Sequence, residues 1–398
     1  MACSRVCGVV SSALLDYNTS KLVHIRNQKI GLIYRLVQLG VIVYIIGYVI
    51  VIKKGYQETD TVLSSVTAKM KGMALVKGNH TDAIWDVADY VVPPQQTDSV
   101  FVTTNAIITE NQTYGVCPED SYVAAGSCDF DADCPADTPV RNGNGWRNGT
   151  CDNSTHTCFI YAWCPTETDV GPSTPLLGDD PKNFTLFIKN NVQFEKFHFH
   201  KSNVLEATSG VNISFLRNCT YNASDPQFQY CPIFRLGTIL DEANEDYEPI
   251  ALKGGIMGIF ITWNCNLDYS TSHCEPKYKF KRLDNAKAAI APGYSFRYPI
   301  YYFVNGVKYR QLVKAYGIRF QILVSGTAGR FSVVPLFLNI GSGIALLGIS
   351  TVLCDLLVLY VVKRRKYYKD NKYETIEDEE ALFGPKEKNL QDYKKVEE

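Results

Sequence analysis

Two long apolar stretches, one near each end of the 398-residue chain, constrain its fold more than any other feature of the sequence. Residues 36–52 contain one strongly polar side chain, Gln38, and residues 333–362 contain one charged side chain, Asp355. Helices of this length span a bilayer, whereas helices in soluble proteins rarely stay apolar around their whole circumference. We therefore predict a membrane protein with two transmembrane helices and a large domain between them.

The basic residues that flank the two stretches predict the orientation of the chain. Lys21, Arg26, Lys29 and Arg35 precede the first stretch with only Asp16 against them, and a Lys-Arg-Arg-Lys run at 363–366 follows the second. Segments rich in lysine and arginine stay on the cytosolic side, so both termini are expected in the cytosol of a plasma-membrane, multi-pass protein. No cleavable signal peptide is visible ahead of the first stretch, which would serve as its own anchor.

These features divide the chain into five expected segments. They are a cytosolic arm at 1–31, a transmembrane helix at 32–54, an extracellular domain at 55–331, a second transmembrane helix at 332–362 and a cytosolic tail at 363–398. The net charge is −1, which gives no basic excess for binding nucleic acid.

Ten of the thirteen cysteines lie between the two apolar stretches, and none of them belongs to a C-x-x-C pair. They are Cys117, Cys128, Cys134, Cys151, Cys158, Cys164, Cys219, Cys231, Cys265 and Cys274. An even number of cysteines without zinc-ribbon spacing predicts five disulfides formed in an oxidising compartment. Spacing alone leaves the pairing of the ten open.

Eight N-x-S/T glycosylation sequons fall in the same segment, and one more, at Asn18, precedes the first stretch. The eight begin at Asn79, Asn111, Asn148, Asn153, Asn183, Asn212, Asn218 and Asn222. A single sequon is weak support for glycosylation, but eight sequons and ten cysteines in one segment predict a glycosylated extracellular domain.

The segment between the stretches is predicted to be β-rich. Runs of valine, isoleucine, threonine, phenylalanine and tyrosine, bounded by turn residues, lie at 99–109, 184–188, 258–263, 298–304 and 316–324. Residues 117–164 are instead dense in cysteine, glycine, asparagine and aspartate, which indicates a lobe held by disulfides rather than by an apolar core. The expected fold class is therefore two transmembrane helices with a large β-rich, disulfide-stapled ectodomain.

Two helices cannot enclose a water-filled path, so a channel built from this chain would need several copies around an axis. The candidate pore residues are Leu338, Asn339, Ser342 and Ala345 in the second stretch. Leu338, Ser342 and Ala345 share one helical face, and a gate and simple helix packing explain that face equally well. For Asp355, a hydrogen bond to a neighbouring helix is favoured over a role in ion binding.

Seven short motifs of this sequence carry a family resemblance. They are K-M-K-G at 69–72, N-F-T at 183–185, C-P-I-F-R-L-G at 231–237, R-L-D-N at 282–285, A-P-G-Y at 291–294, K-A-Y-G-I-R-F at 314–320 and N-I-G-S-G at 339–343. In sequence and order they resemble the ATP-gated, P2X-type purinergic receptors. The resemblance implies a homotrimeric channel that extracellular ATP opens to Na+, K+ and Ca2+, with no catalytic residues and no cofactor.

The resemblance also implies an ATP site between neighbouring subunits. Its residues map onto Lys69, Lys71, Thr185, Ser295, Arg297 and Lys314. Lys69 and Lys71 would point the same way on a strand and offer clustered cations to a polyphosphate, although a K-x-K pair alone usually marks a solvated face. The family commonly has asparagine where this chain has Ser295, so the reach of that hydrogen-bonding side chain is shorter here.

The disulfide order that the resemblance implies does not follow from spacing. It pairs Cys117 with Cys164, Cys128 with Cys151, Cys134 with Cys158, Cys219 with Cys231, and Cys265 with Cys274.

Two alternatives share the topology and stay open on the sequence. A surface nucleotide hydrolase can have two spans and a glycosylated ectodomain, but it needs a phosphate-cradling glycine loop, and the chain contains neither a P-loop nor G-x-G-x-x-G. Another trimeric two-span channel, selective for sodium or gated by acid, or a non-conducting adhesion receptor, would lack the ATP-site motifs.

A metal site is only weakly indicated. His198 and His200 flank Phe199 and would share a strand face, so zinc modulation is a secondary hypothesis. Alternating histidines in a β-rich segment are more often surface residues or face a partner.

Overall fold

In a computed structural model of the chain, residues 28–77, 82–168, 173–204, 213–288, 290–362, 365, 366 and 369 are described. They form two compact units: one combines the residues up to Glu58 with those from Phe331 onward, and the other spans Thr59–Arg330. The sequons at Asn79 and Asn212, the N-terminal arm up to residue 27 and nearly all of the tail lie outside the described residues.

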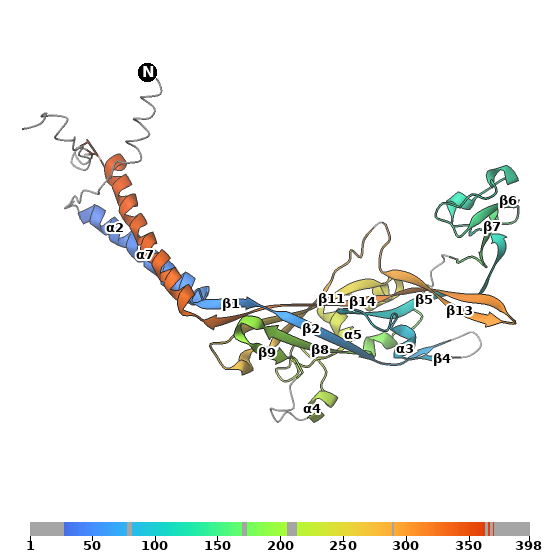
Figure 1. Cartoon of the computed structure of the whole chain (residues 1–398), viewed down its shortest axis with the longest axis horizontal. Coiled ribbons are helices and arrows are strands. Elements are labelled where there is room, and N and C mark those ends of the chain that lie inside the picture. The colour runs from blue at the N-terminus through green and yellow to red at the C-terminus, as the bar shows by residue number, and fades with distance from the viewer. Residues whose placement is uncertain are drawn as a thin grey trace, which may run out of the picture. The chain divides into compact units, whose positions relative to one another are not determined.

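The first unit contains the two apolar helices. Helix α2 (Gln28–Val43) continues as the π-helix η1 (Tyr44–Ile52), and helix α7 (Val333–Leu356) continues as the π-helix η8 (Leu357–Val361). Within this unit α2 packs alongside α7 (Figure 1). Residues 28–52 and 333–361 are long and apolar enough to cross a membrane, and no residue of α2 is buried within the chain. Apolar surface of this extent needs lipid or further copies of the chain to cover it.

The second unit is built mainly from strands. Their bounds are β1 Gln57–Thr61 (which begins in the first unit), β2 Leu63–Lys71, β3 Ala74–Val76, β4 Ala83–Trp85, β5 Ser99–Pro118, β6 Trp146–Asp152, β7 Thr157–Cys164, β8 Thr185–Phe194, β9 Phe199–Ser202, β10 Ile233–Arg235, β11 Gly255–Asn266, β12 Pro276–Arg282, β13 Ser295–Val304 and β14 Val307–Phe331. Each of the five predicted runs falls largely within one of these strands, and the predicted fold class is confirmed.

Short helices connect the strands. They are α3 Val87–Tyr90, α4 Ile213–Asn218, α5 Leu236–Glu242 and α6 Tyr247–Lys253, with 3-10 turns η2 Ala124–Gly126, η3 Asp131–Asp133, η4 Asp180–Asn183, η5 Glu195–Phe197 and η7 Thr271–His273. The Asp86 side chain accepts a hydrogen bond from the Ala88 amide and caps α3.

Two sheets organise the second unit. The larger has the strand order β12-β11-β14-β5-β7-β6, with β13 also paired with β14, and the smaller has the order β10-β8-β2, with β9 paired with β8. Strand β5 pairs with β14 along residues 99–112 and with β7 along residues 113–118. One long strand thereby links the main sheet to the cysteine-rich lobe that carries β6 and β7 (Figure 1).

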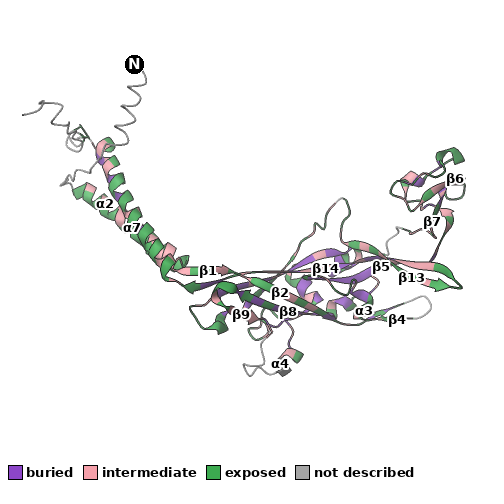
Figure 2. Ribbon diagram, in the orientation of Figure 1, coloured by how far each residue is buried: buried purple, intermediate pink, exposed green. Residues whose placement is uncertain are grey.

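The two sheets share one hydrophobic core, and buried residues concentrate along strands such as β5 and β14 (Figure 2). Alternate residues of β8, including Leu186, Ile188 and Phe194, are buried, as the two-residue period of a strand requires. They belong to the same core cluster as Ile259 and Phe320 of the larger sheet. Burial of this apolar surface is the main stabilising contribution of the unit.

The five disulfides of the described residues have the pairing that the resemblance implied. They join Cys117 to Cys164, Cys128 to Cys151, Cys134 to Cys158, Cys219 to Cys231 and Cys265 to Cys274. Three of them lie wholly within residues 117–164, where the buried clusters are small. The predicted disulfides of this lobe are present, but the lobe also has a small apolar core of Val140, Ile160 and Ala162, so disulfides do not replace a core entirely.

Asn190 is the polar exception on the buried face of β8. It is fully buried, its Oδ1 accepts a hydrogen bond from Trp263 Nε1 at 2.7 Å, and its Nδ2 donates to the Ser65 carbonyl at 3.2 Å. This side chain therefore ties strands of both sheets together.

Replacing Asn190 with alanine leaves the buried Trp263 N–H without an acceptor, which should cost about 1–3 kcal/mol. We expect a lower apparent unfolding temperature of the detergent-solubilised protein, measured by tryptophan fluorescence. Asn191→Ala, one residue along the strand and exposed, is the matched control and should change little. Equal effects of the two substitutions would contradict this role for Asn190.

Candidate functional site

Lys69 and Lys71 lie on β2 with their side chains on the exposed face of the strand. Met70 between them points into the core and is 7% exposed. Alternation along the strand therefore presents both ammonium groups to solvent from a backbone that the buried methionine anchors.

The next strand places a hydroxyl beside these lysines. Thr185, the first residue of β8, pairs directly with Lys71, and its Oγ1 donates a hydrogen bond to the Lys71 carbonyl at 3.4 Å. On the other side of Thr185, β10 places the exposed Arg235 at the paired position. Directly paired residues share a face, so Lys71, Thr185 and Arg235 form one row across this sheet.

The other three predicted residues lie on the β13–β14 hairpin of the larger sheet. Arg297 pairs directly with Lys314, and Ser295 pairs with Tyr316. Arg297 and Lys314 thus present two positive charges side by side on one face of the hairpin. Like charges directly opposite each other destabilise a strand pair unless an anion is close by.

Glu167 supplies that anion in this structure. Its Oε2 accepts a hydrogen bond from Arg297 Nε at 2.6 Å. Its Oε1 lies 3.8 Å from Lys314 Nζ, which is close enough for an ion pair but too long for a hydrogen bond. The side chains of Glu167 and Lys314 are 8% and 10% exposed, so this carboxylate lies between the two cations in a largely desolvated place.

Neighbouring residues hold the segment that carries Glu167. The Cys117–Cys164 disulfide joins the end of β7 to β5, and the segment leaves directly after Cys164. Gln112 of β5 donates a hydrogen bond to the Pro165 carbonyl at 2.7 Å. The same glutamine accepts one from Arg310 Nε at 2.6 Å, so the segment is tied to β14 as well as to β5.

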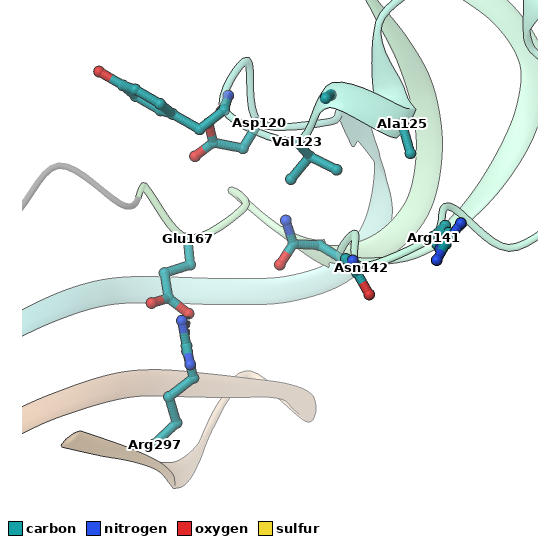
Figure 3. Close-up of a pocket in the computed structure, with 10 residues that line it drawn as sticks. Asp120, Val123, Ala125, Arg141, Asn142, Glu167 and Arg297 are labelled. Atoms are coloured by element: carbon teal, nitrogen blue, oxygen red, sulfur yellow. Dashed lines mark hydrogen bonds and ion pairs between the residues drawn. The ribbon is translucent and has the colours of Figure 1, made fainter. Parts of the chain in front are cut away.

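Glu167 and Arg297 also line a pocket of about 440 Å³ between the hairpin and the cysteine-rich lobe. Its other walls are Asp120, Tyr122, Val123, Ala124, Ala125, Arg141, Asn142 and Asn144. Figure 3 shows the Glu167 carboxylate directed at the Arg297 guanidinium, with Asn142 on the lobe side of the pocket. The pair is therefore accessible from a cavity large enough to admit part of a ligand.

Two glycines with left-handed backbone conformations position the segment that leads into β13. Gly254 has φ +80° and Gly293 has φ +84°, and a Cβ at Gly293 would collide with the Lys253 carbonyl. The Tyr294 amide donates to that same carbonyl at 3.1 Å. The A-P-G-Y motif therefore needs its glycine so that Ser295 and Arg297 enter the hairpin at this position.

The arginine and aspartate of the R-L-D-N motif form a cluster of charged side chains with Glu245. Arg282 donates from Nε and Nη2 to the two carboxylate oxygens of Asp284, each at 3.0 Å, and from Nη1 to Glu245 at 2.9 Å. Burial alone would raise the pKa of the Asp284 carboxyl. The hydrogen bonds from Arg282 and from the Ile256 amide outweigh it and hold that pKa below its ordinary value.

The candidate pore residues divide between two environments. Leu338, Ser342 and Ala345 are exposed on α7, whereas Gly343 is buried against Ile45 of the first apolar helix. Asn339 Nδ2 donates to the Gly55 carbonyl at 2.7 Å and to the Pro335 carbonyl at 2.9 Å, both within the first unit. The structure thus separates the face with Leu338, Ser342 and Ala345 from Asn339, which ties α7 to the end of η1.

The expectation that His198 and His200 share a strand face is wrong. His198 follows the 3-10 turn η5 with φ +49°, in the left-handed region, and β9 begins only at Phe199. The strand alternation therefore does not extend to His198. Within the part of the chain that is described, the one group of possible ligands close enough to hold a metal is Cys128, Cys134 and Cys151, and each of these sulfurs is in a disulfide.

Six sequon asparagines are described. Asn111, Asn153, Asn183, Asn218 and Asn222 are exposed, and Asn148 is half-buried.

Sequence reasoning missed two charged residues of the site. Glu167 is one of several acidic residues after Cys164, and only the fold shows that it meets Arg297 and Lys314. Arg235 lies inside the C-P-I-F-R-L-G motif, but its pairing with Thr185 depends on strand register. No local pattern signals either contact.

Comparison with known proteins identifies a family that the chain matches over most of its length. A family model described as ATP P2X receptor matches residues 15–375. P2X purinoceptor 4 of Mus musculus is 48% identical over 387 residues, which cover 95% of this chain and 98% of the relative. P2X purinoceptor 5 of Homo sapiens is 45% identical over 378 residues, which cover 93% and 84% of the two chains.

Two solved structures share the fold. One is the crystal structure of an invertebrate P2X receptor from the Gulf Coast tick with ATP and Zn2+, with a TM-score of 0.74, 42% identity, and coverage of 82% of this chain and 100% of that one. The other is the chicken ATP-gated P2X7 receptor channel with the competitive antagonist TNP-ATP, with a TM-score of 0.72, 38% identity, and coverage of 83% and 99%.

A family match over residues 15–375, together with 48% identity across nearly the full length of a relative, shows that this chain belongs to the ATP P2X receptor family.

Proposed function

We propose that this chain is one subunit of a plasma-membrane channel that extracellular ATP opens to Na+, K+ and Ca2+. The observation that supports ATP as the ligand is the division of the six candidate residues into two cationic groups. Lys69, Lys71 and Thr185 belong to the smaller sheet, and Ser295, Arg297 and Lys314 belong to the β13–β14 hairpin. Each copy then offers two half-sites, and ATP is bound where those of neighbouring copies meet.

The charges suit a polyphosphate. Lysine ammonium groups and the forked arginine guanidinium make charge-assisted hydrogen bonds to phosphate oxygens, and several such contacts together offset the desolvation of the phosphates. Glu167 offsets part of the positive charge of Arg297 and Lys314 before ATP arrives. A phosphate group takes the place of this carboxylate, so part of the binding free energy is spent on breaking that pair.

The pore requires more than one copy. We propose a homotrimer in which the α7 helices surround the axis, with Leu338, Ser342 and Ala345 facing it and Gly343 facing the first helix. Support comes from the exposure of the first three residues and the burial of Gly343 within one chain. A constriction of apolar and small side chains, rather than a ring of charges, would then shut the pore.

The proposed membrane orientation places both termini in the cytosol and the sequons outside. It rests on the distribution of basic residues, disulfides and sequons along the chain. Zinc modulation stays a secondary proposal, supported only by the presence of Zn2+ with the tick receptor. Membership of a receptor family leaves nothing in favour of the nucleotide-hydrolase alternative, or of an unrelated two-span channel.

Cells that express the chain should give an inward cation current when ATP is applied outside. Removing one charge-assisted phosphate contact in Lys71→Ala should cost about 1.5–3 kcal/mol, or roughly ten- to a hundredfold in the ATP concentration for half-maximal current. The matched control is Lys189→Ala, an exposed lysine on the neighbouring strand of the same sheet.

Two outcomes would overturn the proposal. One is the absence of ATP-evoked current at normal surface expression, in cells where mouse P2X purinoceptor 4 responds. The other is an ATP sensitivity in Lys71→Ala that equals those of wild type and Lys189→Ala.

Single cysteines introduced at Leu338, Ser342 and Ala345 should react with a water-soluble thiol reagent applied from outside. At least the deepest of the three should react faster when ATP is present, because opening admits water past the constriction. Ser350→Cys is the control, since Ser350 is fully buried in the chain and should stay unreactive. Equal rates with and without ATP at all three positions would place the gate elsewhere on the chain.

A further inference from the structure

The cysteine-rich lobe exposes an aromatic face that the proposed channel function does not use. Its strands β5, β7 and β6 turn Ile160 and Ala162 inward, where they are 0% and 4% exposed. On the outer face Trp146 is 56% exposed, and its directly paired neighbour Tyr161 is 42% exposed. Trp146 and Tyr161 therefore form an exposed aromatic pair on this face.

A glycosylation sequon begins two residues after Trp146. The segment reads Trp146-Arg147-Asn148-Gly149-Thr150, and Asn148 to Thr150 form the sequon. Arg147 points inward, because its Nη2 donates to the Ala125 carbonyl at 2.7 Å and its Nη1 to Thr138 Oγ1 at 3.1 Å. Trp146, the residue before it, is paired with Tyr161 and lies on the opposite, outer face.

The backbone bulges at the sequon. Strand β6 pairs with β7 at Arg147 and again at Cys151, opposite Ile160 and Cys158, so three residues of β6 stand against one of β7. Gly149 adopts φ +98°, a conformation that favours glycine. The bulge takes Asn148 out of the regular ladder, two residues along the chain from Trp146.

We propose that the first N-acetylglucosamine of a glycan on Asn148 lies against the Trp146 ring, next to Tyr161, and stabilises the cysteine-rich lobe. The face of an indole ring carries partial negative charge, and the C–H groups on one face of a pyranose carry partial positive charge, so the two surfaces attract. Contact also removes apolar area of both groups from water. The inference rests on the extracellular placement in the proposed function, since N-glycans are added only to lumenal segments, which become extracellular at the cell surface.

The chain contains its own comparison. Of the eight sequons between the spans, only the one at Asn148 has an aromatic residue two positions earlier; at Asn153 that position is Cys151. Asn153 is exposed and belongs to the turn between β6 and β7 in the same lobe. A glycan there belongs to the same lobe, but it has no tryptophan two residues before it in the sequence.

The test uses the full-length receptor from cells that make only oligomannose glycans, trimmed with endoglycosidase H to one sugar per site. Hydrogen exchange of amides in β6 and β7 is measured by mass spectrometry in wild type, Asn148→Gln, Trp146→Thr and the double variant. Loss of the Asn148 sugar should speed exchange about three- to tenfold when Trp146 is present. It should have no effect in the Trp146→Thr background, and Asn153→Gln should have none in wild type.

Equal exchange in wild type and Asn148→Gln would overturn the inference, as would an equal effect of Asn148→Gln with and without the tryptophan. Glycopeptide analysis of the same samples distinguishes failure of the stacking contact from failure of the proposed function. An unmodified Asn148 beside occupied sequons elsewhere overturns the stacking contact alone. Absence of glycan from every sequon between the two spans contradicts the extracellular placement on which the inference and the proposed channel both depend.

Discussion

Two positive charges lie opposite each other on the β13–β14 hairpin, and the proposed ATP site depends on how these charges are balanced. Arg297 and Lys314 are direct partners in the strand ladder, and the Lys314 side chain is only 10% exposed. A buried cation is costly unless an anion lies beside it, and Glu167 fills that role in this structure. An anion therefore stabilises this pair of cations, and either a carboxylate or a phosphate can provide the negative charge.

Two long strands, β14 and β5, connect Lys314 and the segment that carries Glu167 to the rest of the chain. Strand β14 contains Lys314 and ends at Phe331, and α7 begins at Val333. Only one residue therefore separates the strand that carries the proposed phosphate half-site from the proposed pore helix. Strand β5 pairs with β14 and then with β7, whose end leads into the segment that carries Glu167. ATP opens a pore only to the extent that it prefers the open arrangement.

The two apolar helices, the β-strands and the disulfide-rich lobe could be predicted from the sequence. Each depends on a local property: the length of an apolar stretch, a run of β-forming residues, or cysteines gathered in one segment. The family resemblance identified the lysines of K-M-K-G as candidate site residues, and strand alternation predicted only that they point the same way. The disulfide order came from family resemblance alone. Contacts that depend on tertiary position were not predictable: Glu167 reaches Arg297 from 130 residues away, and no pattern marks it. Local backbone conformation misled the prediction for His198, since a left-handed residue ends the alternation that its spacing with His200 suggested.

The most direct test of this charge balance is the ATP sensitivity of Glu167→Gln. Removing the carboxylate destabilises the unliganded site, where it lies between Arg297 and Lys314, more than the bound site, where phosphate replaces it. The concentration for half-maximal current should fall roughly tenfold relative to wild type, at equal surface expression. Glu110→Gln, an exposed carboxylate on β5, should leave it unchanged. An unchanged or higher concentration in Glu167→Gln would show that Glu167 does not compete with ATP for these cations.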